Sequence, residues 1–207
     1  MLTQPLSQLV SDYENYYITA FDNELYNYNV INTLDELIKK SIYSDYRSKL
    51  SLGKSNEYYI DSTSLSDMNN YCKISNARID LLKCIKFEEL LKVMYYPRQI
   101  NLITGFDPIY VYDSCLRFGV NTDVTLNPDS GAKRDIILPD YIYIHNESQN
   151  GAKNLFQSLS ISYIPRYHSW DNKKEFPYLE LKDFPSPLNR LLPHHIENFL
   201  FIYEDQL

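Results

Sequence analysis

Two acids and a lysine in the second half of the chain have the types and spacing of a metal-dependent hydrolytic site. Asp140 follows a proline at the start of an expected strand, and Glu180 and Lys182 lie two residues apart on a segment of alternating polarity. That alternation places the two polar side chains on one face of a strand. The carboxylates would hold Mg²⁺ as the cofactor, which generates the attacking hydroxide, and the lysine would position the water or a phosphate.

This set resembles the PD-(D/E)xK nucleases, in which an acid at a strand end precedes an acid-x-Lys triplet on the next strand. The resemblance implies a Mg²⁺-dependent nuclease with Asp140, Glu180 and Lys182 at the metal. The chain departs from that pattern because 40 residues and an expected helix separate Asp140 from Glu180, where the family has a direct hairpin. Asp171-Asn172-Lys173 is a second acid-x-Lys triplet, and such triplets recur by chance in a chain of this size.

A second candidate is a thiol enzyme formed by Cys72, His168 and Asp183. A nucleophilic thiolate needs a histidine to take its proton, and an acid orients that histidine. The spacing of His168 and Asp183 is similar to the His-to-Asp spacing of transglutaminase-like and arylamine acetyltransferase enzymes, and this resemblance implies a papain- or transglutaminase-like thiol enzyme. Cys115 is an alternative nucleophile, whereas Cys84 falls within an expected helix and is more typical of a core position.

Tyrosine is the unusual feature of the composition, with 20 residues against 9 phenylalanines and 1 tryptophan. Tyrosine provides a large contact area with a polar tip and is enriched at protein interfaces. An AT-rich genome is an alternative explanation, because it raises the content of Tyr, Asn, Ile and Lys together. The leading hypothesis is a protein-interaction module, such as a subunit of an assembly, an inhibitor or an effector. The expected interface residues are Tyr13, Tyr16, Tyr17, Tyr28, Tyr141 and Tyr143.

The charge of the chain favours a protein partner over a nucleic acid. The 207 residues include 27 acidic and 20 basic side chains, for a net charge of −7, and no run of Lys or Arg occurs. A partner protein with a basic face is therefore expected, and binding of nucleic acid is disfavoured. Three cysteines without a CxxC pair are typical of a reducing compartment, and no apolar run or secretion signal is evident. We expect a cytoplasmic protein without a membrane partner, although export without a signal stays possible.

The predicted fold is α+β, with a helical segment over residues 1–96 and a sheet-based segment over residues 97–207 that together form one compact domain. Apolar residues at helical spacing predict one helix from Leu6 to Tyr28, another from about Leu34 to Tyr46, and a third from about Asn76 to Tyr96, ended by Pro97. A short helix is expected after Ser148.

A mostly antiparallel sheet of five to seven strands is predicted for the second half. The expected strands are Ile100–Thr104, Ile109–Tyr112, Thr122–Leu126, Arg134–Leu138, Tyr141–His145, Tyr178–Phe184 and Phe199–Tyr203, with Ile161–Ile164 and Glu57–Ile60 as further short candidates. A hairpin loop is expected at Asn127–Ala132. In the segment from Tyr141 to His145, Ile142 and Ile144 should face the core, and Tyr141, Tyr143 and His145 should share the other face.

Overall fold

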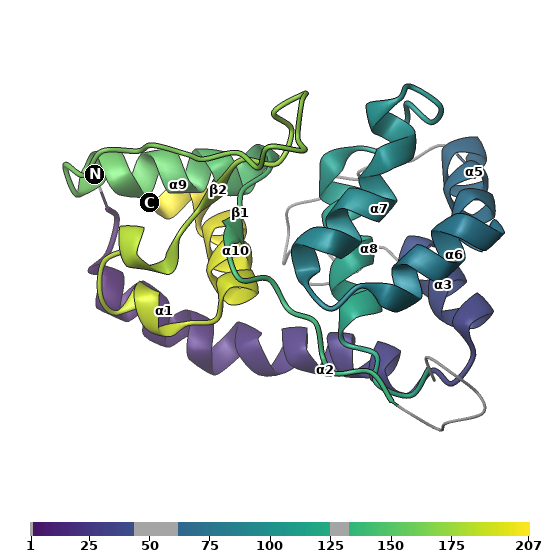
Figure 1. Cartoon of the computed structure of the whole chain (residues 1–207). Helices are drawn as coiled ribbons and strands as arrows, with labels where there is room; N and C mark the ends of the chain where they lie inside the picture. Colours follow the sequence, from purple (N-terminus) through teal and green to yellow (C-terminus); the bar gives the residue numbers. More distant parts are fainter. Residues whose placement is uncertain (1, 44–61, 125–132) are drawn as a thin grey trace. The chain divides into compact units, whose positions relative to one another are not determined.

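The computed structural model describes residues 2–43, 62–124 and 133–207, and these residues are mostly helical (Figure 1). The chain divides into two compact units. Unit 1 comprises Met1–Ala20 and Pro139–Leu207, and unit 2 comprises Phe21–Leu138. Each unit is described by itself below.

The predicted sheet of five to seven strands is wrong. The only sheet among the described residues has two short antiparallel strands, β1 (Ile142–Tyr143) and β2 (Tyr178–Leu179). Several segments with strand-like composition are helical instead. Ile109–Tyr112 lies in helix α8 and Phe199–Tyr203 lies at the end of helix α10. Neither Ile100–Thr104 nor Arg134–Leu138 nor Ile161–Ile164 forms a strand.

The expected N-terminal helix is present, and it contains an irregular turn. It consists of α1 (Leu6–Tyr13), a π-helical turn (Glu14–Ile18) and α2 (Thr19–Asn29). The apolar stripe predicted from the sequence is buried in α1 at Leu6, Leu9, Val10 and Tyr13. The π turn interrupts that stripe, because its own five residues include none that is buried.

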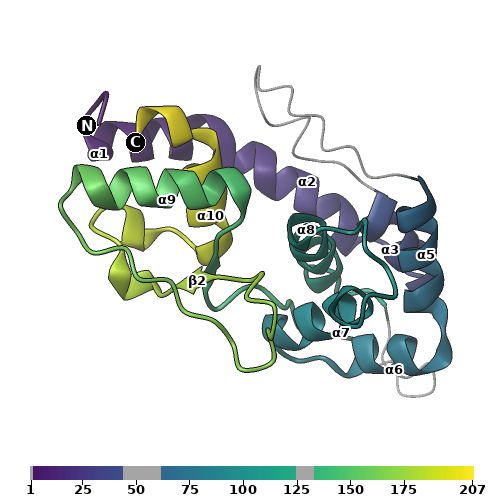
Figure 2. The ribbon, with the colours of Figure 1, turned by 90° about the horizontal axis from the view of Figure 1, so that it is seen from above.

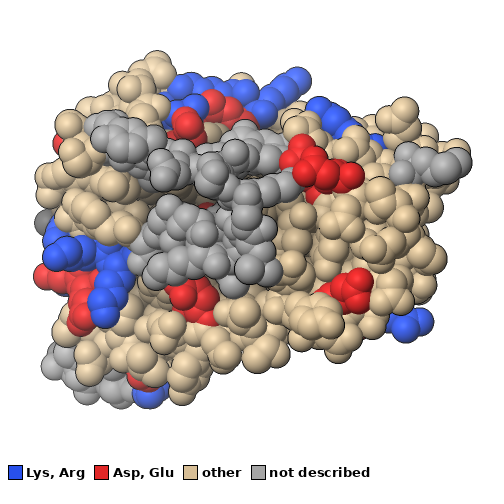
Figure 3. Space-filling model, turned by 180° about the vertical axis from the view of Figure 1, so that it is seen from behind, with Lys and Arg blue, Asp and Glu red and all other residues tan. Residues whose placement is uncertain are grey.

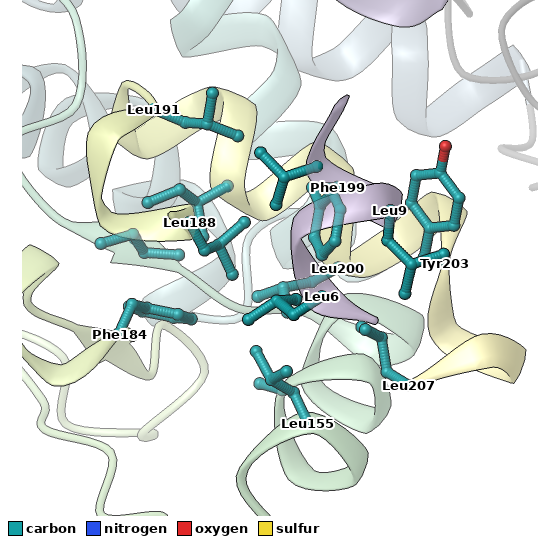
Figure 4. Close-up of a cluster of buried hydrophobic side chains, with 14 of the residues drawn as sticks. Leu6, Leu9, Leu155, Phe184, Leu188, Leu191, Phe199, Leu200, Tyr203 and Leu207 are labelled. Atoms are coloured by element: carbon teal, nitrogen blue, oxygen red, sulfur yellow. The ribbon is translucent and has the colours of Figure 1, made fainter. Parts of the chain in front are cut away.

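Unit 1 is built around a core to which α1, α9 (Asn146–Ser158) and α10 (Pro193–Ile202) contribute. Short 3-10 turns follow at Leu181–Asp183, Leu188–Arg190 and Glu204–Gln206. Figure 4 shows that side chains from α1, α9, α10 and the irregular segment before α10 point toward one another. This core includes Leu6, Leu9, Leu155, Phe184, Leu188, Leu191, Phe199, Leu200, Tyr203 and Leu207. Ile142 and Ile144 are also fully buried in it, as predicted.

Unit 2 is a helical array in which α8 (Pro108–Gly119) is the central element. Ten of its residues are buried, and it packs against α7 (Phe87–Gln99) and α3 (Leu34–Tyr43), as Figure 2 shows. Helices α5 (Ser62–Lys73) and α6 (Ser75–Lys83) and most of α2 also belong to this unit. The run Ile109–Tyr112 at the start of α8 consists of β-formers, which explains why this segment was predicted to be a strand.

Two expected boundaries differ from the structure. The helix expected from about Asn76 to Tyr96 is divided into α6 and α7 by an extended break at Cys84 and Lys86. Pro97, expected to end this helix and to mark the boundary between segments, lies inside α7. The expected strand Glu57–Ile60, the hairpin loop Asn127–Ala132 and the end of the expected strand Thr122–Leu126 lie outside the described residues.

Within the described ranges, the helices lack the combination of length and apolar character that a bilayer-crossing segment requires.

Candidate aromatic binding surface

Three separate segments of unit 1 converge on a group of partly exposed aromatic side chains. Strand β1 pairs with β2 so that Ile142 lies opposite Leu179 and Tyr143 lies opposite Tyr178. Arg166 then pairs with Tyr178 through two backbone hydrogen bonds of 2.9 Å. The result is a small pleated layer of three segments. Strands β1 and β2 form a regular sheet, and the segment at Arg166 adds a single bridge to β2.

The two faces of this layer have different compositions. Ile142, Ile144 and Leu179 point into the core of unit 1. The tyrosines alternate with them and therefore lie on the opposite face, because successive side chains of an extended segment point to opposite sides. The predicted separation of aliphatic and phenolic faces is present here, although it involves two strands rather than a large sheet.

We define the aromatic surface as Tyr141, His168, Trp170 and Tyr178, all of which are partly exposed. The imidazole of His168 is stacked on Tyr178, with ring centroids 4.5 Å apart, and on Trp170 at 5.4 Å. The rings of Tyr141 and Tyr178 lie 4.6 Å apart, and those of Tyr141 and His168 lie 5.5 Å apart. Tyr141, His168 and Tyr178 are therefore in mutual contact, and Trp170 joins them through His168.

Buried groups beneath the surface fix its geometry. Tyr143 and Phe176 are buried under the surface rings, and the Tyr143 hydroxyl lies 2.9 Å from Nε2 of His168. This hydrogen bond sets the orientation of the imidazole plane against which Trp170 and Tyr178 stack. The rings thus form a preorganised surface, which lowers the entropy cost of binding.

The loop that carries Trp170 is held by a buried carboxylate. Asp171 is 3% exposed and accepts hydrogen bonds from the backbone N–H groups of Glu175, at 3.0 Å, and Phe176, at 2.7 Å. Lys174 adopts a left-handed conformation within the turn, and its ammonium group lies 5.8 Å from the centre of the Tyr167 ring. Asp171 was an acid-x-Lys candidate from the sequence, and its observed role is to position the aromatic loop.

The residues proposed for a nuclease site have other partners. Asp140 is exposed, and no group of three potential metal ligands among the described residues includes it or Glu180. Glu180 forms ion pairs with Lys182 and, at 3.6 Å, with Arg166. These contacts neutralise Glu180 with cations from its own chain.

The residues proposed for a thiol enzyme lie in different surroundings. His168 belongs to the aromatic surface, and the Asp183 carboxylate is held by Arg166, at 2.5 and 3.2 Å, and by the backbone N–H of Glu180. The hydrogen bond from Arg166 lowers the pKa of Asp183. Cys72 belongs to unit 2, where complete burial raises the pKa of its thiol to about 12, so the thiolate is scarce at neutral pH.

Burial also raises the pKa values of the other two thiols. The pKa of Cys84 rises to about 12, and that of Cys115 rises well above its usual value. All three cysteines are free and buried, which gives them the character of small core side chains.

The six tyrosines expected at an interface occupy different environments. Tyr13, Tyr28 and Tyr143 are buried within their units, whereas Tyr16 is 73% exposed on the π turn. Tyr17 is partly exposed and stacks on Tyr13 with centroids 5.9 Å apart, and Tyr141 is part of the aromatic surface. The sequence did not identify Trp170, Tyr178 or His168 as members of one surface, although the alternation around Tyr141 indicated its phenolic face.

Acidic side chains outnumber basic ones in unit 1. Unit 1 contains 11 acidic and 6 basic side chains, so it carries −5 of the net charge of −7. Figure 3 shows acidic and basic groups in small separate clusters on the face drawn, without a broad basic field among its described residues.

Comparisons with protein families, curated proteins and solved structures found no match to this chain.

Proposed function

We propose that the protein is a protein-interaction module whose unit 1 binds a partner with a basic face through the aromatic surface. The observation that carries this proposal is the stacked, partly exposed group of Tyr141, His168, Trp170 and Tyr178 on an acidic unit. Tryptophan and tyrosine dominate the binding energy of many interfaces because they supply large contact areas at a small entropy cost.

The chemistry of the aromatic surface favours a cationic partner. Faces of tryptophan and tyrosine rings attract Arg and Lys side chains. Lys174 already lies over the ring of Tyr167 next to this surface, at 5.8 Å, which illustrates the same interaction within the chain. The net charge of −5 on unit 1 adds long-range attraction for a basic protein and accelerates association.

A subunit, inhibitor or effector role is compatible with this mode of binding. The three free, buried thiols support the cytoplasmic location that we propose, because a reducing compartment keeps such thiols unpaired. Nucleic acid is a poorer partner for an acidic unit, since phosphates require a basic surface.

The proposal is tested by comparing variants in a capture experiment from the native source. Proteins retained by the wild-type chain should be lost with Trp170→Ala and with Tyr141→Ala. They should be retained by Tyr16→Ala, a control that removes an exposed tyrosine outside the aromatic surface. Circular dichroism of each variant establishes that it is folded.

A specific partner should be released by about 0.5 M salt more readily than by a neutral osmolyte, because exposed charge pairs are screened. Capture that Trp170→Ala and Tyr141→Ala leave intact, or that Tyr16→Ala reduces equally, would contradict the proposed surface.

A further inference from the structure

The segment that follows α9 forms an outer edge of the pleated layer in unit 1. Arg166 donates its backbone N–H to the carbonyl of Tyr178 and accepts the N–H of Tyr178, each at 2.9 Å. In an antiparallel pair, the backbone groups of successive residues point alternately toward the partner strand and away from it. The backbone groups of Pro165 and Tyr167 therefore point away from β2, and the same alternation directs those of Tyr163 outward.

These outward groups are unpaired within the described parts of the chain. No backbone hydrogen bond there involves the N–H or C=O of Tyr163 or Tyr167, or the C=O of Pro165. We define residues 163–167 as the free edge, which offers two N–H donors and three C=O acceptors at alternate positions. Pro165 removes a single donor, and a proline within a sheet is typical of an edge position.

The free edge is open to solvent. Figure 2 shows that the chain after α9 follows the periphery of unit 1. None of the residues 160–170 is buried, and the side chains of Ile164 and Tyr167 are 68% and 38% exposed. An exposed edge with unpaired N–H and C=O groups is a template for pairing with another extended chain.

The free edge is continuous with the aromatic surface. Residues that pair across antiparallel strands have side chains on the same face, so Arg166 shares the face of Tyr178, and His168 follows two residues later on that face. Tyr178 and Trp170 both stack on His168, with centroids at 4.5 and 5.4 Å, and therefore lie on its two opposite faces. Trp170 is thus the ring of this stack on the side away from β2, next to the end of the free edge.

We propose that the basic partner binds through an extended segment that adds as a further strand to the free edge. This inference rests on the proposed function and specifies how the same surface recognises its partner. Strand addition takes affinity from main-chain hydrogen bonds and specificity from the alternating side chains. The partner segment would complete the unpaired backbone groups and place its side chains beside the aromatic surface.

The two faces of the free edge indicate the side chains of this segment. Tyr163 points to the inner face, where its ring contacts Phe156 with centroids 5.9 Å apart, so partner residues on that face should be apolar. The residues between them lie on the face of the aromatic surface, where a cationic side chain reaches the outer face of Trp170. The partner segment therefore alternates apolar and cationic residues.

Charge favours such a segment over a second copy of this chain. Pairing two free edges would bring together two units that each carry a net charge of −5, whereas a basic segment is attracted by that charge. Pro165 would also be present on both edges and would remove a donor from each.

A peptide of alternating valine and arginine, about nine residues long, tests the inference by isothermal titration calorimetry with the full chain. Two isomers carry the same number of N-methyl groups, either on valines or on arginines, so their composition and charge are equal. Only the valines lie opposite Tyr163, Pro165 and Tyr167, so only their N–H groups face the free edge. Methylation of the valines should weaken binding at least about tenfold, and methylation of the arginines should change it less than about twofold.

A variant pair assigns the binding to the free edge. Tyr167→Pro removes an outward N–H and should weaken binding of the unmethylated peptide at least about fivefold. Ser162→Pro is the matched control, because it removes an N–H of the same exposed segment that points to the other side, and it should bind normally. Circular dichroism checks the fold of both variants. In the wild-type chain, hydrogen exchange at the amides of Tyr163 and Tyr167 should slow when the peptide binds.

Equal affinities of the two N-methyl isomers would overturn strand addition, and so would unchanged exchange at Tyr163 and Tyr167 in the complex. Either result would leave the proposed function intact if binding still requires Trp170. Absence of binding by the unmethylated peptide would also overturn the inference. A dimer of the wild-type chain that Tyr167→Pro dissociates would overturn it too, because the free edge would then be occupied by a second copy.

Discussion

Replacing Gly151 by alanine should destabilise unit 1 through the contact between α9 and α10. An added Cβ would lie 2.1 Å from the carbonyl oxygen of Leu200 and 2.9 Å from its carbonyl carbon. Both opposing atoms are backbone atoms of a helix, so no side-chain rotation relieves the overlap. The two helices would have to separate by about 1 Å to restore an ordinary contact.

The expected magnitude combines a loss and a gain. Overpacking a core in this way costs about 1–3 kcal/mol, and the rigid backbone at Leu200 favours the upper half of this range. Alanine recovers about 1 kcal/mol relative to glycine through its helix propensity. The net loss should be about 1–2 kcal/mol, which corresponds to a melting temperature lowered by about 2–8 °C in a protein of this size.

The assay is urea unfolding followed by the fluorescence of Trp170, the single tryptophan of the chain and a member of unit 1. Lys153→Ala is the matched control, because it changes an exposed residue of α9 and should alter stability by less than about 0.5 kcal/mol. A Gly151→Ala protein as stable as the wild type, or more stable, would refute the close packing of α9 against α10.

Two further predictions concern titratable groups inside the units. Burial, with a smaller contribution from neighbouring His195, lowers the pKa of His194 from 6.5 to about 3. Below about pH 6.5, His194 therefore binds a proton in the unfolded chain but not in the folded chain. The free energy of unfolding should then fall from pH 6.5 toward pH 3 by about 1.4 kcal/mol per pH unit. His194→Gln should flatten this slope in urea titrations between pH 6.5 and 4, and an unchanged slope would contradict the assignment. Iodoacetamide at pH 7.5 should leave Cys72, Cys84 and Cys115 unmodified in the native protein and should label all three in urea, as mass spectrometry would show. Rapid labelling of Cys72 in the native protein would contradict this prediction and would support the thiol-enzyme hypothesis.

The sequence predicted the N-terminal helices better than the central ones. Leu6, Leu9, Val10 and Tyr13 recur at helical spacing and are buried, because α1 has one apolar face and one polar face. In α8 the run Ile109–Tyr112 consists of β-formers, and this local preference outweighed the signal of Asp107-Pro108, with a proline in the first helical turn.

Part of α10 was likewise predicted to be a strand. Phe199–Tyr203 is apolar enough for a buried strand, but Pro193 begins a helix there and Ile196, Phe199, Leu200 and Tyr203 follow at helical spacing. Short apolar runs do not distinguish the two structures, and the start signal before the run is the more reliable criterion.

The candidate surface was only partly predictable. The alternation of Tyr141 and Tyr143 with Ile142 and Ile144 indicated the phenolic face correctly, because a two-residue period is a local property. Tyr178, His168 and Trp170 join that face only through the pairing of β1 with β2, and no local pattern encodes such a pairing.

The central claim is that the aromatic surface of unit 1 receives cationic side chains of a basic partner. The most direct measurement is a titration with an arginine-rich peptide, followed by the emission of Trp170 at low and at high ionic strength. We predict saturable quenching at low salt that weakens in about 0.5 M salt and is lost with Tyr141→Ala and Tyr178→Ala. Emission of Trp170 that does not change with the peptide, or that changes equally with an aspartate-rich peptide, would contradict the claim.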